Sequence, residues 1–334
     1  MKKLISVLSL LAIILSLASC NTNDQDETDV EETKEIVLGD EVESVVLTTV
    51  EGEKITCNTD TDFYEIFNKV YSRGRAGEKH SYIAETKMGD NSKSFTNMDV
   101  YYPANFANGF LIEASVKKEG DDAASVIEEY NYNNTSADNK REMTTLVSYT
   151  YKDEKAFGGT VLDANGYKVY ASEEYPIIPE VGTELQDMQV RAGYLRMFTT
   201  SPALFQHLES REANGKTYDF DEFVTREYKL YENYIVFKQT APFIYVNTNA
   251  GNDPDILHAA FSNAECSITQ EAYCNVQTGK IELIKVYGDT LWFSPEYWGQ
   301  KMEINMEIYI HTVGEAEIQQ KIDKFVEYIK SSVE

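Results

Sequence analysis

Basic residues and histidines are scarce in this 334-residue chain, and each shortage excludes a class of function. Lys and Arg number 30 against 56 Asp and Glu, which gives a formal net charge of −26. Because nucleic acids and anionic head groups are bound through many basic contacts, both are poor partners for this chain. The histidines lie far apart with neither His-x-x-x-His nor Glu-x-x-His spacing, so no metal or general-base site is indicated. They are His80, His207, His258 and His311.

Sequence motifs that carry catalysis are also missing. There is no Gly-x-Ser-x-Gly sequence, no phosphate-binding glycine loop and no nucleotide-binding motif. Asn58-x-Asp60-x-Asp62 resembles the start of a calcium loop. Phe63 stands where that loop requires glycine and Lys69 where it ends in glutamate, so helix capping explains these acids better. The sequence therefore predicts no catalytic residue, no metal and no cofactor, and a protein that is not an enzyme.

The one stretch with a strong signature is the N-terminal leader. Two lysines at positions 2 and 3 precede an uncharged, mostly apolar run over residues 4–17, followed by small residues. This is the pattern of a secretory signal peptide, and the run is shorter than the ~20 residues that an ordinary spanning helix needs. Its end, Leu17-Ala18-Ser19-Cys20, resembles the bacterial lipobox of an aliphatic residue, two small residues and a cysteine.

The lipobox resemblance implies cleavage before Cys20 and attachment of diacylglycerol to its sulfur, with acyl chains such as palmitate. Two acyl chains would anchor the protein stably at the membrane, since each buried CH₂ contributes ~0.8 kcal/mol. The expected location is therefore the outer face of the cell membrane, with residues 1–19 as signal peptide. The alternative is an ordinary cleaved signal peptide that happens to precede a cysteine.

Residues 20–44 are predicted to be an acidic, disordered tether, because they are rich in Asp and Glu and contain no aromatic residue. Removing residues 1–19 takes away two lysines and no acid, which changes the net charge from −26 to −28. The chain has only 7 prolines and no Pro- or Ser-rich linker, so residues 45–334 are predicted to form a single α+β domain.

Hydrophobic periodicity predicts a strand-rich domain with a few helices. Predicted helices cover residues 62–72, 185–198, 201–208 and 318–333. Predicted strands cover residues 110–117, 125–132, 142–151, 160–162, 167–171, 223–231, 234–241, 266–276, 281–287 and 301–311. Residues 121–132 can also be read as a helix, and periodicity alone does not decide between the two.

The order of these elements resembles that of the LolA and LppX-like lipoprotein carriers. The resemblance implies a single curved antiparallel β-sheet, a half-barrel of about 11 strands, covered by helices that leave a cavity for acyl chains. It rests on element order over residues 60–334 and on no residue motif.

Two strands with strict alternation supply the candidate ligand-lining residues. One apolar face carries two flexible methionines, and the other carries small residues and one amide. The candidates are Ile268, Gln270, Ala272, Met302, Ile304, Met306 and Ile308. Such faces either line a cavity for an apolar or amphiphilic ligand or pack as a filled core with Gln270 hydrogen-bonded inside it.

An aromatic cluster offers a second hypothesis: Trp292, Phe293, Tyr297 and Trp298 lie between two predicted strands. Exposed, they would belong to a non-catalytic surface module that binds a protein or glycan; buried, they would close one end of the core.

Three cysteines besides Cys20 leave the disulfide pattern open. Cys266 and Cys274 would be about 26 Å apart along one extended strand, from ~3.3 Å per residue, so they cannot pair within it. Both belong to its apolar face and are predicted to be small core residues. Pairing of Cys57 with either one remains an alternative.

Overall fold

The computed structural model describes most of the chain after the leader. The described residues are 36–70, 76–90, 93–103, 109–135, 141–151, 154–163, 166–171, 210–213, 215–242, 244–246, 254–262, 265–293 and 299–332. The predicted signal peptide, Cys20, most of the tether and the helices predicted at 185–198 and 201–208 lie outside them. The chain divides into two compact units, Met1–Ile36 and Val37–Glu334, and the architecture below is that of the second.

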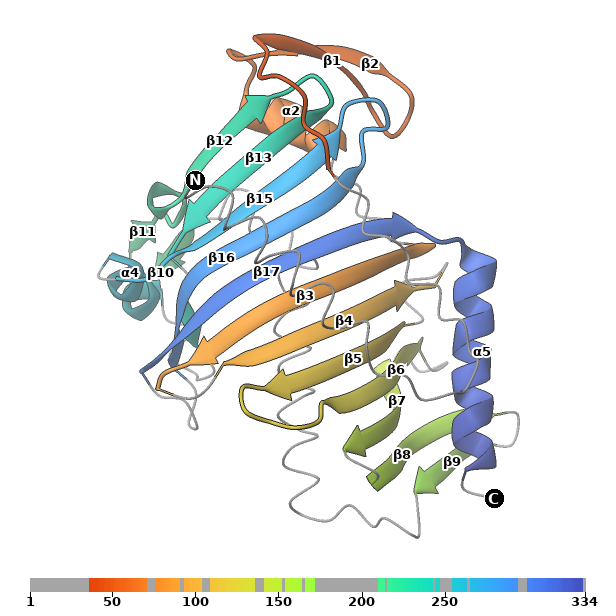
Figure 1. The fold of residues 1–334 in the computed structure, drawn as a ribbon. Coiled ribbons are helices and arrows are strands. Elements are labelled where there is room, and N and C mark those ends of the chain that lie inside the picture. Colours follow the sequence, from red (N-terminus) through yellow and green to blue (C-terminus); the bar gives the residue numbers. More distant parts are fainter. Residues whose placement is uncertain are drawn as a thin grey trace, which may run out of the picture. The chain divides into compact units, whose positions relative to one another are not determined.

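A 13-stranded sheet forms the body of this unit and consists of two meanders joined side by side (Figure 1). The first meander runs through β3 (Glu78–Met88), β4 (Ser94–Tyr102), β5 (Phe110–Lys118), β6 (Ser125–Thr135), β7 (Arg141–Tyr151), β8 (Glu154–Asp163) and β9 (Gly166–Ala171). The second runs through β12 (Thr225–Leu230), β13 (Tyr234–Ala241), β15 (Ile268–Asn275), β16 (Ile281–Phe293) and β17 (Gln300–Thr312). Antiparallel pairing of β17 with β3 joins them, and β12 and β9 are the two ends of the open sheet.

Smaller elements complete the unit. β14 (Ile244–Val246) pairs in parallel with β16. Two hairpins lie outside the sheet: β1 (Ser44–Thr48) with β2 (Lys54–Asn58), and β10 (Arg211–Ala213) with β11 (Lys216–Tyr218). The helices within the described residues are α2 (Phe63–Val70), α4 (Pro254–Ser262) and α5 (Glu315–Ser331), with a 3-10 turn at Asp221–Phe223. Among the described helices, none is long and apolar enough to cross a membrane.

The large antiparallel sheet confirms the main sequence-based expectation, with corrections. Every predicted strand overlaps an observed one, and residues 125–135 form strand β6 rather than a helix. The sheet has 13 strands, not about 11, and the ten strands predicted individually lack β3, β4 and the short β14. Helices α2 and α5 confirm the helices predicted at 62–72 and 318–333 with slightly different bounds, and α4 was not predicted.

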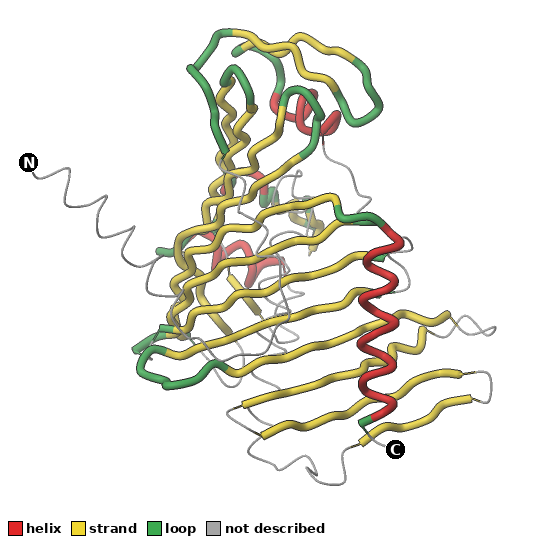
Figure 2. The backbone as a smooth tube through the Cα atoms, turned by 45° about the vertical axis from the view of Figure 1, so that its right-hand side comes forward, coloured by secondary structure: helices red, strands yellow, loops and turns green. Residues whose placement is uncertain are grey.

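The sheet separates two hydrophobic clusters, one on each face. The larger cluster includes inward residues of nearly every strand from β12 to β7, together with Ile66, Phe67 and Val70 of α2. The smaller cluster lies on the opposite face, where Tyr101, Leu111 and Leu146 of the sheet pack against α5. Figure 2 shows α5 crossing the strands of that part of the sheet. Helices α2 and α5 therefore pack on opposite faces, which differs from the expectation that helices cover a single face.

Helix α2 is tied to the larger cluster by its cap and its aromatic residues. Asp62 Oδ1 accepts hydrogen bonds from the backbone N–H groups of Tyr64 and Glu65 at 2.9 and 3.1 Å, so the acid caps the helix N-terminus. The Phe63 and Phe67 rings contact Phe237 of β13 edge-on, with centroids 5.5 and 5.3 Å apart. The helix is thereby held against the β12–β13 end of the sheet.

Gly288 lets β15 and β16 approach each other where β15 begins. Its φ is +128°, and a Cβ at this position would lie 2.2 Å from the carbonyl oxygen of Ser267. The next residue, Asp289, donates its backbone N–H to that same carbonyl at 2.9 Å. Only glycine fits this combination of close contact and backbone conformation.

We predict that Gly288→Ala lowers the free energy of unfolding by about 1–3 kcal/mol more than Gly120→Ala. Both glycines have positive φ, so both substitutions strain the backbone, but a Cβ at Gly120 meets no atom within 4 Å. Urea denaturation followed by circular dichroism measures the two values. Equal losses would show that the Ser267 contact relaxes without cost.

Candidate functional site

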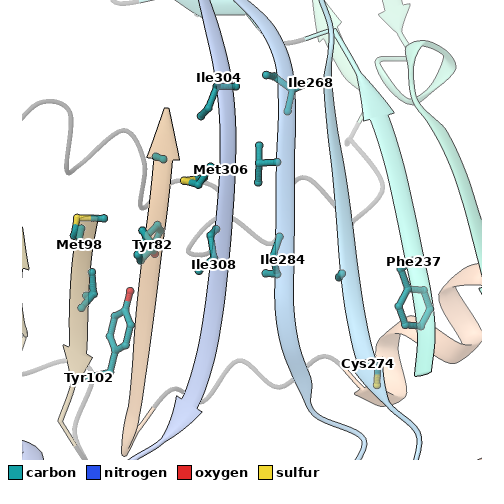
Figure 3. Close-up of a cluster of buried hydrophobic side chains, with 14 of the residues drawn as sticks. Tyr82, Met98, Tyr102, Phe237, Ile268, Cys274, Ile284, Ile304, Met306 and Ile308 are labelled. Atoms are coloured by element: carbon teal, nitrogen blue, oxygen red, sulfur yellow. The ribbon is translucent and has the colours of Figure 1, made fainter. Parts of the chain in front are cut away.

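All seven predicted lining residues lie on the face of the sheet that carries the larger hydrophobic cluster. Each is at most 5 % exposed. In Figure 3 the labelled side chains Ile304, Met306 and Ile308 of β17 lie along the same face as Ile268 and Ile284. The alternation in the sequence thus correctly predicts that these side chains share one buried face of the sheet. That they line a ligand cavity stays a prediction.

Strand register aligns these residues with others that the sequence did not single out. Met306 is opposite Val286 on β16 and Ala84 on β3, and Ala84 is opposite Thr96 on β4. One lateral row of side chains therefore crosses four strands of this face. Each of these four residues is at most 4 % exposed.

Methionines are concentrated in the middle of the face. Met302 and Met88 are directly opposite each other on β17 and β3, and Met306 and Met98 lie further along β17 and β4. Four of the chain's 8 methionines thus lie on one face of three adjacent strands, and we call these four residues the methionine patch. Because thioether side chains are unbranched and adaptable, such a patch can follow the shape of a flexible apolar ligand.

Helix α2 packs against β13, which is three strands away from the methionine patch. It contacts Phe237 on β13, whereas the nearest strand of the patch is β17, with β15 and β16 between them. At ~4.8 Å per strand the separation is about 14 Å. The hairpin β1–β2 packs at the same end as α2, since Tyr228 of β12 donates its hydroxyl to the backbone carbonyl of Asn58 at 2.6 Å.

A polar group lies on the same face beyond the apolar residues. Arg226 of β12 donates from Nε to Gln239 Oε1 at 2.9 Å and from Nη2 to Asp221 Oδ1 at 2.7 Å. Gln239 is directly opposite Gln270, and these two amides are 2 % and 1 % exposed. The Arg226 guanidinium also lies 5.4 Å from the centroid of the Tyr64 ring.

Sequence reasoning identified Gln270 and missed its partners. Arg226 and Gln239 each occupy an alternating position beside apolar residues, which is the only local signal that they face inward. Their alignment with Gln270 depends on pairing among β12, β13 and β15, and periodicity within one strand does not report that pairing.

The opposite face of the sheet is charged and rich in tyrosine. Glu227, Lys238, Glu271, Lys285 and Glu307 follow one another across five strands. The Lys238–Glu227 and Lys285–Glu307 ion pairs measure 3.0 and 3.2 Å. Exposed apolar residues lie on the same face: Ile83, Phe95, Val126 and Tyr287.

A tyrosine–carboxylate cluster lies within that charged face. The hydroxyls of Tyr273 and Tyr287 each donate to a different oxygen of Glu271 at 2.9 Å. Partial burial and this acidic partner both raise the pKa of the Tyr287 phenol, so it remains a neutral donor near neutral pH. The carboxylate of Glu271 is thus paired within this face.

The predicted aromatic loop is only partly within the described residues. Trp292 and Phe293 form the last two residues of β16, where Trp292 is opposite Gln300 of β17 and Tyr245 of β14. Tyr297 and Trp298 lie outside the described residues. The exposure of this loop therefore stays a prediction.

The histidines that the structure describes have separate surroundings. His80 is buried on the apolar face, with Nε2 2.9 Å from Glu78 Oε2. His258 of α4 lies 2.9 Å from Glu222 and packs against the Tyr218 and Phe223 rings. Within the described part of the chain, no group of three or more His, Cys, Asp or Glu residues is arranged to hold a metal ion.

Cys57, Cys266 and Cys274 are free thiols, and all three are buried. Burial is the main cause that raises their pKa values, and the pKa of Cys57 reaches about 11, with a further contribution from the charge of Glu65. Cys57 and Cys274 belong to the larger hydrophobic cluster and act as small apolar residues there.

No family model matches the chain, and no curated protein matches it in sequence. Among solved structures it is similar to the beta-barrel-like protein of domain of unknown function DUF1849 from Brucella abortus. The sequence identity is 11 %, the TM-score is 0.23, and the match covers 71 % of this chain and 99 % of that chain. A TM-score this small supports no statement about fold or ligand.

We predict that these three thiols do not react with iodoacetamide at pH 8 in the folded protein and react fully in urea. Burial keeps them protonated and inaccessible, and unfolding removes both protections. The chain carrying Cys20→Ser is used so that only these three cysteines of the chain's 4 remain, and mass spectrometry counts the adducts. Labelling of Cys57 in the native protein would contradict its burial.

Proposed function

We propose that this protein is a lipid-anchored lipoprotein on the outer face of the cell membrane that binds an apolar or amphiphilic ligand on the apolar face of its open sheet. The observation that supports ligand binding is the methionine patch in the middle of that face. A core that only had to be filled gains more specific packing from Leu, Ile and Val, whose shapes are better defined. A ligand of variable shape needs flexible side chains.

The anchor is supported by the leader and by the acidic segment after it. Cys20 at the end of the apolar run is the acceptor for the lipid. Residues 21–35 carry seven acids and one lysine, so they are repelled by an anionic bilayer and would hold the folded unit away from it. The ligand face is then reachable from the extracytoplasmic space.

We predict that Cys20→Ser moves the protein from the membrane fraction to the soluble fraction, because it removes the sulfur that accepts the lipid. Fractionation of cells and immunoblotting measure the distribution, and Cys57→Ser, which changes a buried thiol, serves as the matched control. Retention of the Cys20→Ser protein in the membrane would refute the lipid anchor.

Ala84 distinguishes a ligand cavity from a filled core. It lies on the apolar face between Met306 and Thr96 and is 4 % exposed. We predict that Ala84→Phe lowers the free energy of unfolding by less than about 1 kcal/mol and abolishes binding of dodecanol, because the ring occupies ligand space. In a filled core the same ring would cost about 1–3 kcal/mol through overpacking.

The matched control is Ile83→Phe, one residue earlier on β3, where the side chain is 48 % exposed on the opposite face. It should change neither stability nor dodecanol binding. Urea denaturation gives the stability and native mass spectrometry of the Cys20→Ser chain gives the bound dodecanol. A strongly destabilised Ala84→Phe variant, with no dodecanol bound to the unsubstituted sheet, would show that the face is a filled core.

A second candidate, a non-catalytic surface module for a protein or glycan, is favoured by the exposed Phe95 and Tyr287 on the opposite face. These two residues are 44 % and 38 % exposed and lie on the face that carries the Lys238–Glu227 and Lys285–Glu307 ion pairs. If a partner binds this face, Phe95→Ala or Tyr287→Ala would abolish its binding, whereas Ala84→Phe on the apolar face would leave the binding unchanged.

A further inference from the structure

The first residues of the folded unit are bound to the turn between β12 and β13. We call residues 37–42 the strap. The backbone N–H groups of Glu232 and Asn233 donate to the carbonyls of Asp40 and Leu38, both at 3.0 Å. Asp40 and Glu232 are 192 residues apart in the chain. The strap therefore joins the start of the unit to a turn near its middle.

A glycine and an amide side chain fit the strap to this turn. Gly39 has a φ of +78°, and a Cβ at this position would lie 2.7 Å from Glu232 Oε2. The strap can approach the turn this closely because position 39 carries no side chain. At the beginning of the strap, Asn233 Nδ2 donates to the carbonyl of Val37 at 3.1 Å.

The strap follows the turn and then leaves the sheet. Val42 donates its backbone N–H to the carbonyl of Leu230 at 3.0 Å, and two residues later the chain enters β1, which pairs with β2. A segment that only protected the outer edge of the sheet would continue along β12 and cover its open backbone groups. The strap instead fixes one point, the place where the preceding tether meets the folded unit.

The hairpin β1–β2 lies at the same end of the strands (Figure 1). Thr48 donates its backbone N–H to the carbonyl of Val276 in the turn between β15 and β16, at 2.7 Å. The opposite end of the sheet carries the end of β16 at Phe293 and the turn that follows Met88 of β3. At ~3.3 Å per residue, the 13-residue β16 separates the two ends by about 40 Å.

The tether is short compared with that separation. Residues 20–36 connect the lipid acceptor Cys20 to the strap. A flexible chain of this length has an r.m.s. end-to-end distance on the order of 25 Å. The strapped end therefore stays close to the bilayer that holds Cys20, whereas the opposite end has a larger average distance from it.

We propose that the strap makes the end of the sheet with the β12–β13 and β15–β16 turns the membrane-proximal end, and that the opposite end, with the residues that follow Phe293, faces extracytoplasmic partners. This inference rests on the proposed lipid anchor and is independent of ligand binding. Asp40, Glu41 and Glu232 make the strapped end acidic, so it faces the bilayer without binding anionic head groups.

The experiment measures fluorescence energy transfer from the lipidated full chain to an acceptor lipid in phosphatidylcholine vesicles. The donor dye is attached to Glu51→Cys, in the exposed turn of β1–β2, or to Asp90→Cys, in the exposed turn after β3. Both changes replace an exposed acid, and the native thiols other than Cys20 are buried. We expect transfer from position 51 to be at least twice that from position 90.

Equal transfer from the two positions, or more from position 90, overturns the orientation. If that transfer still exceeds the transfer measured with Cys20→Ser protein, the lipid anchor stands. Absence of transfer from both positions overturns the anchor as well.

The role of the strap is measured by amide hydrogen exchange of Glu232 and Asn233, whose N–H groups bond to it. We expect Gly39→Val to accelerate this exchange at least tenfold. Gly52→Val is the matched control, since Gly52 also has a positive φ, +85°, but a Cβ there meets no atom within 4 Å. The milder Asn233→Ala removes only the side-chain bond to the strap and keeps the measurement possible if Gly39→Val does not fold. Unchanged exchange of Glu232 in these strap variants overturns the role of the strap.

Discussion

The pairing of β17 with β3 is the contact on which the whole sheet depends. Its eleven residue pairs, from Met302–Met88 to Thr312–Glu78, join segments more than 200 residues apart in the chain. Apart from the short parallel pair of β14 with β16, every other neighbouring pair in the sheet belongs to one of two sequential meanders. Because the entropy of loop closure grows only slowly with length, this single long-range pairing is affordable once both meanders exist. It also places Met302 opposite Met88, and it puts Met306 on the same face as Met98, with β3 between their strands.

The same pairing fixes two chemically different faces. Side chains alternate between the faces along each strand, so the register between strands decides which residues become lateral neighbours. On one face it aligns Val286, Met306 and Ala84 into a buried row, and on the other it aligns Lys285, Glu307 and Ile83. A shift of one residue would bury the charged row, and the cost of burying those charges keeps the register unique.

The sequence predicted those parts of the fold where alternation is strong. Strand β13 was predicted with its observed bounds, and β17 was recognised because Met302, Ile304, Met306 and Ile308 alternate with polar residues. Strand β3 was missed because its buried positions include His80 and Thr86 while Ile83 is exposed, which weakens the period-two pattern. Helix α4 was missed because the apolar residues in its sequence, PDILHAAFS, are nearly consecutive and give no stripe at helical spacing.

For the candidate site, periodicity predicted which side chains of one strand share a face. It did not predict which side chains of neighbouring strands lie next to one another. The placement of Gln270 beside Gln239 and Arg226 arises from two strand pairings that no local pattern encodes. Replacing a buried ion pair by apolar residues is often neutral or stabilising, so stability alone gives little reason for a charge in this row. The partly exposed Asp221 compensates the charge of Arg226 from the side of the turn, and the amides extend toward the methionine patch.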